Sequence, residues 1–499
     1  MELFLFILYF SIFCFCILRF SFFRNAGIPG SWLAGAFVLK VAVGFLTWLF
    51  YLDSLRSMPQ GDIFSFVHDG AILNKVFYSS PSDYFRLLSG IYQESSPMEL
   101  QHLQGSNLWH QHFITGYIND NRVFIRLNSL FSFFSLNSIH IHSLFINFLS
   151  FTGLIALFRS FKNMLPAKEK LFFAVLFLMP SVLFWGSSLL KESFMLFNFG
   201  MFVYHAGRAS ESKLIRHWLF ALVFLFLSLL CKPYVILCFF LPFIAYLYNL
   251  HRRPNRAWPS YIFSLAGVVL IIFSVNFLMS GKPLSALVKK QNDFVNLSKG
   301  GIFLLNDTIL VRLDPALEYR LQKNVRKNSF FIAQQTEVMY WRLDRIEDTI
   351  RAVFEKPVND LSLVWDIKPA GSAIHLDKLE TNWWSIFKVL PYSFYNGFVR
   401  PGLWDVHNAS SLGSAIEMSI YISCLLALLL FSKKRSLNRN LLFLSISFIL
   451  LLCCLIGLTV PVLGSTVRYR IPALIFLGIL LVNLFDVNSA FANFRLKNK

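Results

Sequence analysis

Charged side chains are scarce in this chain. They make up 15% of its 499 residues, while 56% of the residues are hydrophobic and 17% are aromatic. Soluble domains carry about 25% charged residues, and a water-exposed surface cannot accommodate 57 Phe. The composition therefore excludes a soluble enzyme and a disordered chain, and it predicts an all-α polytopic membrane protein.

Acidic residues are the scarcer of the two charged classes, with 27 Asp and Glu against 46 Lys and Arg and a net charge of +19. In a soluble protein such an excess would suggest binding to nucleic acid. In a membrane chain, basic residues in the loops instead report how the chain is oriented. We therefore expect membrane lipids as partners and no nucleic acid.

Cysteine and histidine offer little evidence for a metal centre. All seven cysteines lie within or at the edge of apolar runs, so neither a disulfide framework nor a Cys-based metal site is expected. His110 and His112 are two positions apart and would not share a helix face, which favours a solvated role. A divalent metal (Mg or Mn) remains open as a cofactor, and the sequence predicts no other.

Long apolar runs are the dominant feature of the chain. A helix that crosses a bilayer needs about 20 mostly apolar residues. The first run has no basic start and no small-residue cleavage site, so a helix is expected there and not a signal peptide. We expect about eleven spans, at 2–22, 31–51, 139–158, 171–189, 190–207, 217–232, 233–250, 260–280, 411–431, 441–463 and 470–487.

Basic residues concentrate in alternate short connectors. The positive-inside rule places these connectors in the cytoplasm. The N-terminus is then expected outside and the C-terminus in the cytoplasm, with two long outer loops at 52–138 and 281–410. The basic connectors lie near positions 24, 159–170, 208–216, 252–256, 433–439 and 495–499.

The expected organisation has five parts: two spans in 1–51, an outer loop with an acidic motif and interfacial helices in 52–138, six spans in 139–280, a second outer loop in 281–410, and three spans in 411–499. Within the second loop, periodicity and alternating charge from 312 to 355 predict a mainly helical structure. The segment 384–400 is short and broken by Pro391, so we expect an interfacial or re-entrant piece.

Two carboxylates open the first outer loop. Asp62 lies about ten residues beyond the second span, and Asp69 follows at i+7, so on a helix both would project from one face. Such carboxylates are commonly caps or solvated charges, but near the membrane surface they are also candidate general bases. Farther along, Asp120, Asn121 and Arg122 begin an amphipathic stretch that is expected to lie along the interface.

Charged residues also gather at the outer ends of the expected spans. Lys191 and Glu192 lie where two spans meet and are expected to form an ion pair, whereas snorkelling explains Lys232 well. Charges within spans are costly and point to function. The other members of this set are Glu417, Arg468 and Arg470 with Tyr469 between them, and Arg400 in an aromatic stretch before a proline.

These charges predict a polar cavity that opens to the outside, with carboxylates on one wall and cations on another. The cations suit a phosphate or pyrophosphate group, and the carboxylates suit a general base. The Phe- and Trp-rich spans suit a polyisoprenoid tail. Together they indicate transfer of a sugar from a lipid carrier outside the cytoplasm.

In layout the chain resembles the membrane glycosyltransferases of the GT-C fold, which include protein O-mannosyltransferases, aminoarabinose transferases and the Rgt-like bacterial families. In that fold, too, an acidic first outer loop precedes six spans and a second large outer loop; the extra first span is a departure. The segment from Asp62 to Asp69 resembles the acidic motif of the fold but lacks an adjacent Asp-Glu pair. Arg468-Tyr469-Arg470 resembles the start of a late span.

The resemblance implies an enzyme of a bacterial inner membrane whose active site faces the periplasm. A polyprenyl-phosphate-linked sugar would be the donor, and a glycan, a lipid or a protein would be the acceptor. Asp62, aided by Asp69, would be the catalytic base. The residues that would bind the lipid phosphate are Lys191, Glu192, Arg400, Arg468, Tyr469 and Arg470.

Two other functions stay open. A polysaccharide (O-antigen) polymerase or ligase would also use outer arginines but needs no carboxylate in the first loop. A flippase or transporter of a lipid-linked saccharide usually has inverted repeats and charges near the bilayer midplane. Here no repeat is evident, and the charges cluster at one surface.

Overall fold

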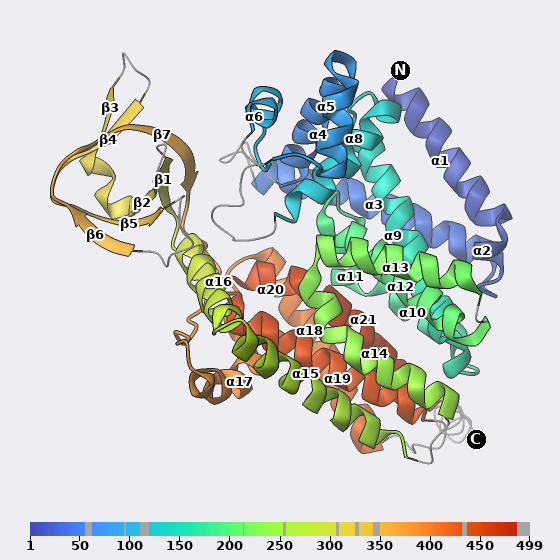
Figure 1. Cartoon of the computed structure of the whole chain (residues 1–499). Helices are drawn as coiled ribbons and strands as arrows, with labels where there is room; N and C mark the ends of the chain where they lie inside the picture. Colours follow the sequence, from blue (N-terminus) through green and yellow to red (C-terminus); the bar gives the residue numbers. More distant parts are fainter. Residues whose placement is uncertain are drawn as a thin grey trace.

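The computed structural model is a bundle of long helices with a β-sheet standing apart from it on one side (Figure 1). Helices α4 (Asp62–Ser79), α5 (Pro81–Ser89) and α6 (Pro97–Leu103), from the expected first outer loop, lie at the top of the bundle in this view. The structure describes residues 1–54, 62–93, 96–109, 119–212, 214–252, 256–305, 309–324, 329–342, 350–431 and 437–486. The basic positions 433–435 and 495–499, and also His110 and His112, lie outside these residues.

The bundle consists of helices rich in Phe, Leu and Ile. They are α1 (Glu2–Arg19), α3 (Gly30–Ser54), α9 (Ile139–Phe161), α10 (Glu169–Leu178), α11 (Pro180–Ser187), α12 (Lys191–Ser212), α13 (Ile215–Cys231), α14 (Pro233–Arg252), α15 (Trp258–Leu278), α18 (Ala409–Phe431), α19 (Arg439–Thr459), α20 (Leu463–Tyr469) and α21 (Ile471–Leu484).

Shorter helices belong to the connecting segments. They are α2 (Ser21–Arg24), α4 (Asp62–Ser79), α5 (Pro81–Ser89), α6 (Pro97–Leu103), α8 (Asn121–Ser135), α16 (Lys282–Ser298) and α17 (Trp383–Phe398), with 3₁₀ turns at Lys162–Met164, Pro315–Arg320 and Leu403–Asp405.

Among the described residues, seven helices are long and apolar enough to cross a membrane, and the number rises to nine if each of two bent pairs is one span. The chain is therefore a multi-pass membrane protein. The two expected spans that fall short are α12, whose ends carry charged residues, and α13, which has only 17 residues. The count of eleven stays a prediction.

The expectation of a mainly helical second outer loop is wrong for its central part. Seven strands form one antiparallel sheet in the order β3-β4-β7-β1-β2-β5-β6. The strands are β1 (Gly301–Leu305), β2 (Ile309–Leu313), β3 (Leu321–Asn324), β4 (Ser329–Ile332), β5 (Thr336–Arg342), β6 (Ile350–Phe354) and β7 (Val358–Ile367). The fold is thus all-α only in the membrane bundle.

The reason for this error is the ambiguity of short apolar patterns. Ile302 and Leu304 on β1, and Val311 and Leu313 on β2, pack in one apolar core. Phe303 and Arg312 between them are buried as well, so burial on these two short strands does not show the period of two that marks a strand. Charges that alternate in sign also suit the solvated face of a sheet. Long-range pairing favours a strand over a helix in this segment, because β1 pairs with β7, which lies about 60 residues later in the chain.

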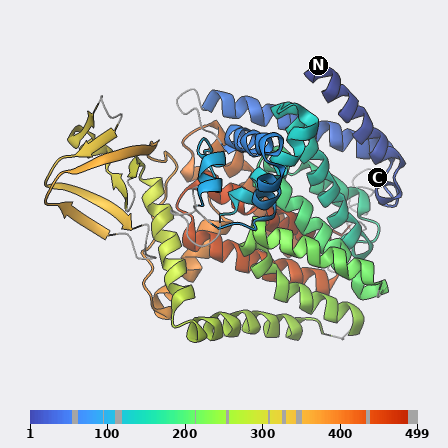
Figure 2. The ribbon, with the colours of Figure 1, turned by 45° about the horizontal axis from the view of Figure 1, so that its top comes forward.

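The sheet is joined to the bundle by α16 and by the chain that leads to α17 (Figure 2). α17 covers most of the segment 384–400, and it packs on α19 at very short range. A Cβ atom on Gly397 would lie 2.0 Å from the carbonyl oxygen of Cys453, and one on Gly457 would lie 1.8 Å from that of Ser393. Only glycine permits this approach. Whether the segment is interfacial or re-entrant stays a prediction.

Helix α11 is bent by 58° from α10, and the two form a bent helix pair, which is the geometry of a broken span or of a re-entrant loop. Helix ends inside a bilayer leave polar backbone groups that water cannot reach. At the start of α11, Glu417 of α18 accepts a hydrogen bond from the backbone nitrogen of Ser181 at 3.0 Å. At its end, the fully buried Lys40 of α3 donates to the carbonyl of Gly186 at 2.7 Å. An acid at the N-terminus and a cation at the C-terminus also match the helix dipole.

The end of α11 determines where the next helix begins. Lys40 Nζ also donates to Ser187 Oγ at 3.2 Å, and Ser193 Oγ donates to the carbonyl of Ser188 at 2.6 Å. These bonds hold the short turn between α11 and α12. The first residue of α12 is Lys191, so the turn positions the first charges of the pocket described below.

Replacing Lys40 by Met should lower the thermal stability of the protein. The change removes one of two donors to the buried carbonyl of Gly186, which keeps Ser150 Oγ at 2.7 Å, and it also removes the donor to Ser187 Oγ. A hydrogen bond from a charged group contributes about 1.5–3 kcal/mol. Unfolding in detergent can be followed with a maleimide that fluoresces on reacting with Cys231, Cys238 and Cys453, which are buried. Lys75→Met, at an exposed lysine of α4, is the control and should unfold like the wild type. An unchanged midpoint for Lys40→Met would contradict the capping role.

Candidate functional site

A cavity of about 430 Å³, here called the charged pocket, lies where the ends of several helices meet. Asp62 begins α4, Lys191 begins α12, and Lys232 separates α13 from α14. Arg468 and Tyr469 end α20. The other lining residues are Asp120, Asn121, Pro233, Tyr234, Leu287, Lys290, Phe294, Leu455, Ile456, Thr459 and Val460.

Glu192 lies behind the wall of the charged pocket and joins two of its cations. Its side chain is 1% exposed. Oε1 lies 3.2 Å from Lys232 Nζ, and Oε2 lies 2.8 Å from Arg468 Nε. The angles of these contacts are not those of hydrogen bonds, so the attraction is between charges. A buried carboxylate requires such partners.

Lys232 is also surrounded by aromatic rings. Its Nζ lies 4.5 Å from the ring centre of Tyr469 and 5.9 Å from that of Tyr234. Cation–π attraction of this kind strengthens where water is excluded. Lys232 is 5% exposed, so it does not snorkel to the surface, contrary to the sequence-based interpretation.

Lys191 forms its ion pair with Asp120 and not with Glu192. Its Nζ lies 2.8 Å from Asp120 Oδ1 and donates to Asn121 Oδ1 at 2.8 Å. The expected Lys191–Glu192 pair fails because consecutive residues of a helix point to different faces. Burial by itself raises the pKa of Asp120, but the positive charges of Lys191 and Lys232 outweigh it and hold that pKa below its ordinary value.

Asp62 meets Arg468 at the rim of the charged pocket. Arg468 Nη1 lies 2.9 Å from Asp62 Oδ2, although the two residues are 406 positions apart in the chain. The Asp62 side chain is 42% exposed, while that of Arg468 is 15% exposed. The guanidinium of Arg468 also lies 6.0 Å from the ring centre of Trp185 on α11. A carboxylate that reaches solvent and faces the cavity can meet a substrate.

Lys290 of α16 is a cation of this pocket that pairs with no acid within ion-pair distance in the described part of the chain. Its Nζ lies 4.5 Å from the ring centre of Phe294. Burial lowers the pKa of Lys290, and Asp120 and Asp293 counteract this only in part. Lys290 is therefore available to an incoming anion.

The charges occupy only part of the cavity wall. Leu287 on α16, and Leu455, Ile456 and Val460 at the end of α19, provide an apolar side. Four cations line the pocket against two carboxylates, with the carboxylate of Glu192 behind them. The space thus suits a ligand with an anionic group and an apolar chain.

Asp69 lies outside the charged pocket. Its two oxygens accept hydrogen bonds at 2.7 Å from the backbone nitrogens of Asn107 and Leu108, and His68 Nδ1 lies 3.2 Å away. Burial raises the pKa of Asp69, and the two backbone hydrogen bonds lower it in part. This geometry holds the loop after α6 in place and turns the carboxylate away from any substrate in the pocket.

Arg400 and Arg470 also lie outside the charged pocket. Arg400 pairs with Asp405, with Nη2 lying 2.5 Å from Oδ1. Arg470 is 1% exposed, and its Nη1 donates to the carbonyls of Phe398 and Arg400. Because Arg470 follows Arg468 by two positions at the start of a new helix, the two side chains point apart. Arg470 fixes the end of α17 to the bundle.

Of the residues expected at the site, the structure thus brings Asp62, Lys191, Arg468 and Tyr469 to the pocket, with Glu192 behind them. Sequence reasoning missed Asp120, Lys290 and the site role of Lys232. The position of Lys232 at a break between two apolar runs was a usable signal. Asp120 and Lys290 look like loop charges in the sequence, and only the packing of their segments brings them to the pocket.

The described residues offer little to a divalent metal. No group of three or more His, Cys, Asp or Glu side chains is placed to hold an ion in the part of the chain that the structure describes. In the charged pocket, Asp62 and Asp120 are each paired with a cation of the protein. These residues do not fit Mg²⁺, which prefers several oxygen ligands.

Comparison with models of known families, with curated proteins and with solved structures finds no match to this chain.

Replacing Glu192 by Gln should destabilise the protein strongly. Removal of one partner of a buried ion pair leaves the others uncompensated and costs about 3–5 kcal/mol. The matched control is Glu211→Gln, because Glu211 forms an exposed pair with Arg208 at 3.7 Å, and such pairs contribute about 0–1 kcal/mol. Thermal unfolding in detergent measures both. Equal midpoints for the two variants would show that Glu192 does not hold the cluster together.

Proposed function

We propose that the protein is a membrane glycosyltransferase of the GT-C type, with a polyprenyl-phosphate-linked sugar as donor. The observation that carries this proposal is the charged pocket itself. It joins cations, one of which has no acidic partner among the described residues, to an apolar wall at the ends of membrane helices. A phosphate attached to a long apolar chain has this combination of properties, and Lys and Arg are common phosphate ligands.

The proposed transfer step uses residues that face the cavity. The acceptor hydroxyl loses its proton to the carboxylate of Asp62, and its oxygen forms a bond to the anomeric carbon of the sugar. The bond from that carbon to the phosphate oxygen breaks, and the electron pair leaves with the polyprenyl phosphate. Lys191, Lys232 and Lys290 stabilise the charge that develops there. The acceptor class is open at this point: a glycan, a lipid or a protein.

The distribution of basic residues supports the proposed orientation, in which the pocket faces the periplasm of a bacterial inner membrane. Helices α12 and α14 begin at the pocket, with Lys191 and Pro233, and α13 ends there. Their other ends carry Arg208, Arg216 and Arg252. At a rise of about 1.5 Å per residue these ends lie about 25–33 Å away. Basic residues on that side suit a cytoplasmic surface, with the N-terminus outside.

Transport of a lipid-linked saccharide is a second candidate, because the described part of the bundle contains two bent helix pairs. α10 and α11 are bent by 58°, and α20 and α21 by 59°. Broken helices with polar residues at the break are typical of transporters. The two functions differ in their products, since a transferase releases polyprenyl phosphate and a transporter moves the donor unchanged.

Replacing Lys290 by Met should weaken the binding of polyprenyl phosphate, which is the product common to all donors of this class. A charge-assisted hydrogen bond contributes about 1.5–3 kcal/mol, so a loss of about tenfold or more is expected. Binding is measured in nanodiscs as the rise in the midpoint temperature of thermal unfolding when polyprenyl phosphate is added. The same rise with polyprenol, which has no phosphate, is the reference. Lys289→Met is the matched control on the same helix. Equal stabilisation by phosphate and alcohol would contradict an anion site.

Measuring the binding of polyprenyl phosphate at several pH values tests the protonation state of Lys290. Its pKa is lowered, so its charge is lost as pH rises through this lowered value, before an exposed lysine loses its own. Above pH 8 the phosphate is already fully charged, because its second pKa is about 6. Wild-type affinity should therefore fall at alkaline pH, while Lys290→Arg should retain it. A parallel fall in both proteins would assign the effect to another group.

Asp62→Asn should reduce transfer by about 10²–10⁴-fold, which is the usual contribution of a general base, and it should leave polyprenyl phosphate binding intact. Release of polyprenyl phosphate from a panel of polyprenyl-phosphate sugars measures transfer. Asp377→Asn, at an exposed acid of the second outer loop, is the control. If Arg468→Ala abolishes activity while Asp62→Asn does not, the base assignment is wrong and a polymerase or ligase is favoured.

A further inference from the structure

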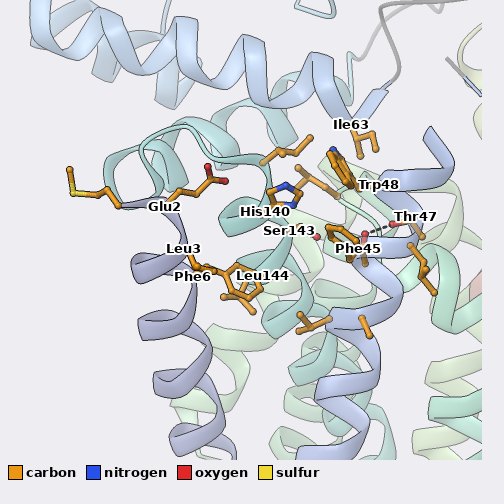
Figure 3. Close-up of a pocket in the computed structure, with 17 residues that line it drawn as sticks. Glu2, Leu3, Phe6, Phe45, Thr47, Trp48, Ile63, His140, Ser143 and Leu144 are labelled. Atoms are coloured by element: carbon orange, nitrogen blue, oxygen red, sulfur yellow. Dashed lines mark hydrogen bonds between the residues drawn. The ribbon is translucent and has the colours of Figure 1, made fainter. Parts of the chain in front are cut away.

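A second cavity is separate from the charged pocket. It has a volume of about 850 Å³ and lies between α1, α3 and α9 (Figure 3). Phe6 of α1, Phe45 of α3 and Leu144 of α9 are among its lining residues. We call it the apolar groove.

The apolar groove has few polar groups, and most of them are uncharged. His140 and Ser143 belong to α9, and Thr47 donates to the carbonyl of Gly44 within its own helix. The one acid, Glu2, forms a hydrogen bond with Ser138 Oγ. No Lys or Arg is among the described residues that line the groove. The groove is therefore unsuited to a phosphate and suited to an apolar chain.

The apolar groove and the charged pocket share a wall. Ile63 lines the groove, and its neighbour Asp62 lines the charged pocket. In the same way Leu189 lines the groove, two positions before Lys191 in the charged pocket. In Figure 3, Ile63 lies at one end of the groove beside Trp48. A chain in the groove would therefore end close to the carboxylate of Asp62.

The apolar groove is also open to the bilayer. Leu3 on α1 and Phe45 and Leu46 on α3 are exposed, whereas Ile63 and Leu189 at the shared wall are 2% and 3% exposed. A lipid can thus enter from the side and reach a closed end. Both cavities lie at the same end of the bundle, since they meet at the start of α4 and at the turn before α12.

We propose that the apolar groove binds the apolar chain of the acceptor, and that the acceptor is therefore a lipid with a hydroxyl in its head group and no phosphate at that depth. The lipid presents its hydroxyl to Asp62 over the shared wall while the donor phosphate occupies the charged pocket. This inference rests on the proposed function and names its acceptor class. The transfer is the one written above, with the lipid oxygen forming the new bond and its proton passing to Asp62.

The test uses a diacylglycerol with a diazirine in one acyl chain, incorporated into nanodiscs with the purified full-length protein. After illumination, the labelled peptides are identified by mass spectrometry. Labels should concentrate on α1, α3 and α9 around the groove. Ala42→Trp fills the groove and should reduce this labelling by about tenfold. Val38→Trp adds the same ring one turn away on α3, outside the groove and exposed to lipid, and should not reduce it.

The outcomes separate this inference from the proposed function. Labelling that follows exposed surface over all helices, or an equal loss in Ala42→Trp and Val38→Trp, overturns the groove as a lipid site whatever the charged pocket does. Groove labelling that persists in Lys290→Met, while polyprenyl phosphate binding is lost, supports two independent sites. With a lipid acceptor, Ala42→Trp should raise the KM for the acceptor and leave the KM for the donor unchanged. A raised donor KM alone contradicts the assignment of the chains to the two cavities.

Discussion

The buried carboxylate of Glu192 is the interaction on which the charged pocket depends. It lies between Lys232 and Arg468, which come from two separate parts of the chain. Without it, two cations with little access to water would repel each other, and α14 and α20 would lose the attraction that brings their ends to α12. A charge that is buried away from water is tolerated only when groups of opposite charge lie beside it. The cluster therefore couples folding of the bundle to assembly of the site.

A second constraint comes from the bent helix pair α10–α11. Its backbone ends lie where water cannot satisfy them, and Glu417 and Lys40 do so from α18 and α3. These contacts hold the turn from which α12 begins. Two sets of charged side chains thus have different tasks: one satisfies the backbone inside the bundle, and the other faces a cavity at its end. On the sequence alone, Glu417 and Arg470 fall in the same outer cluster as Arg468, and this makes Arg470 look like a substrate ligand, although it donates to backbone carbonyls.

Much of the architecture follows from local patterns. Runs of about 20 apolar residues require helices in a bilayer, and the breaks at Lys191 and Lys232 mark helix ends that the structure retains. The strands of the second outer loop could not be found in this way. Each strand is too short, and its apolar residues are too continuous, to separate a period of two from one of 3.6. The pairing of β1 with β7 is a long-range choice that no short window contains.

The sequence by itself determined that the protein crosses a membrane several times and that its charges gather at one end of the helices, because composition and spacing are properties of single segments. Only the tertiary structure decided which of those charges meet. Asp62 and Arg468 are 406 positions apart and form a contact of 2.9 Å, while Arg470, two residues from Arg468, points elsewhere. A side chain's neighbours depend on the direction of its helix face and on the helices packed against it. Neither the direction of a helix face nor the packing of neighbouring helices can be derived from a single short sequence motif.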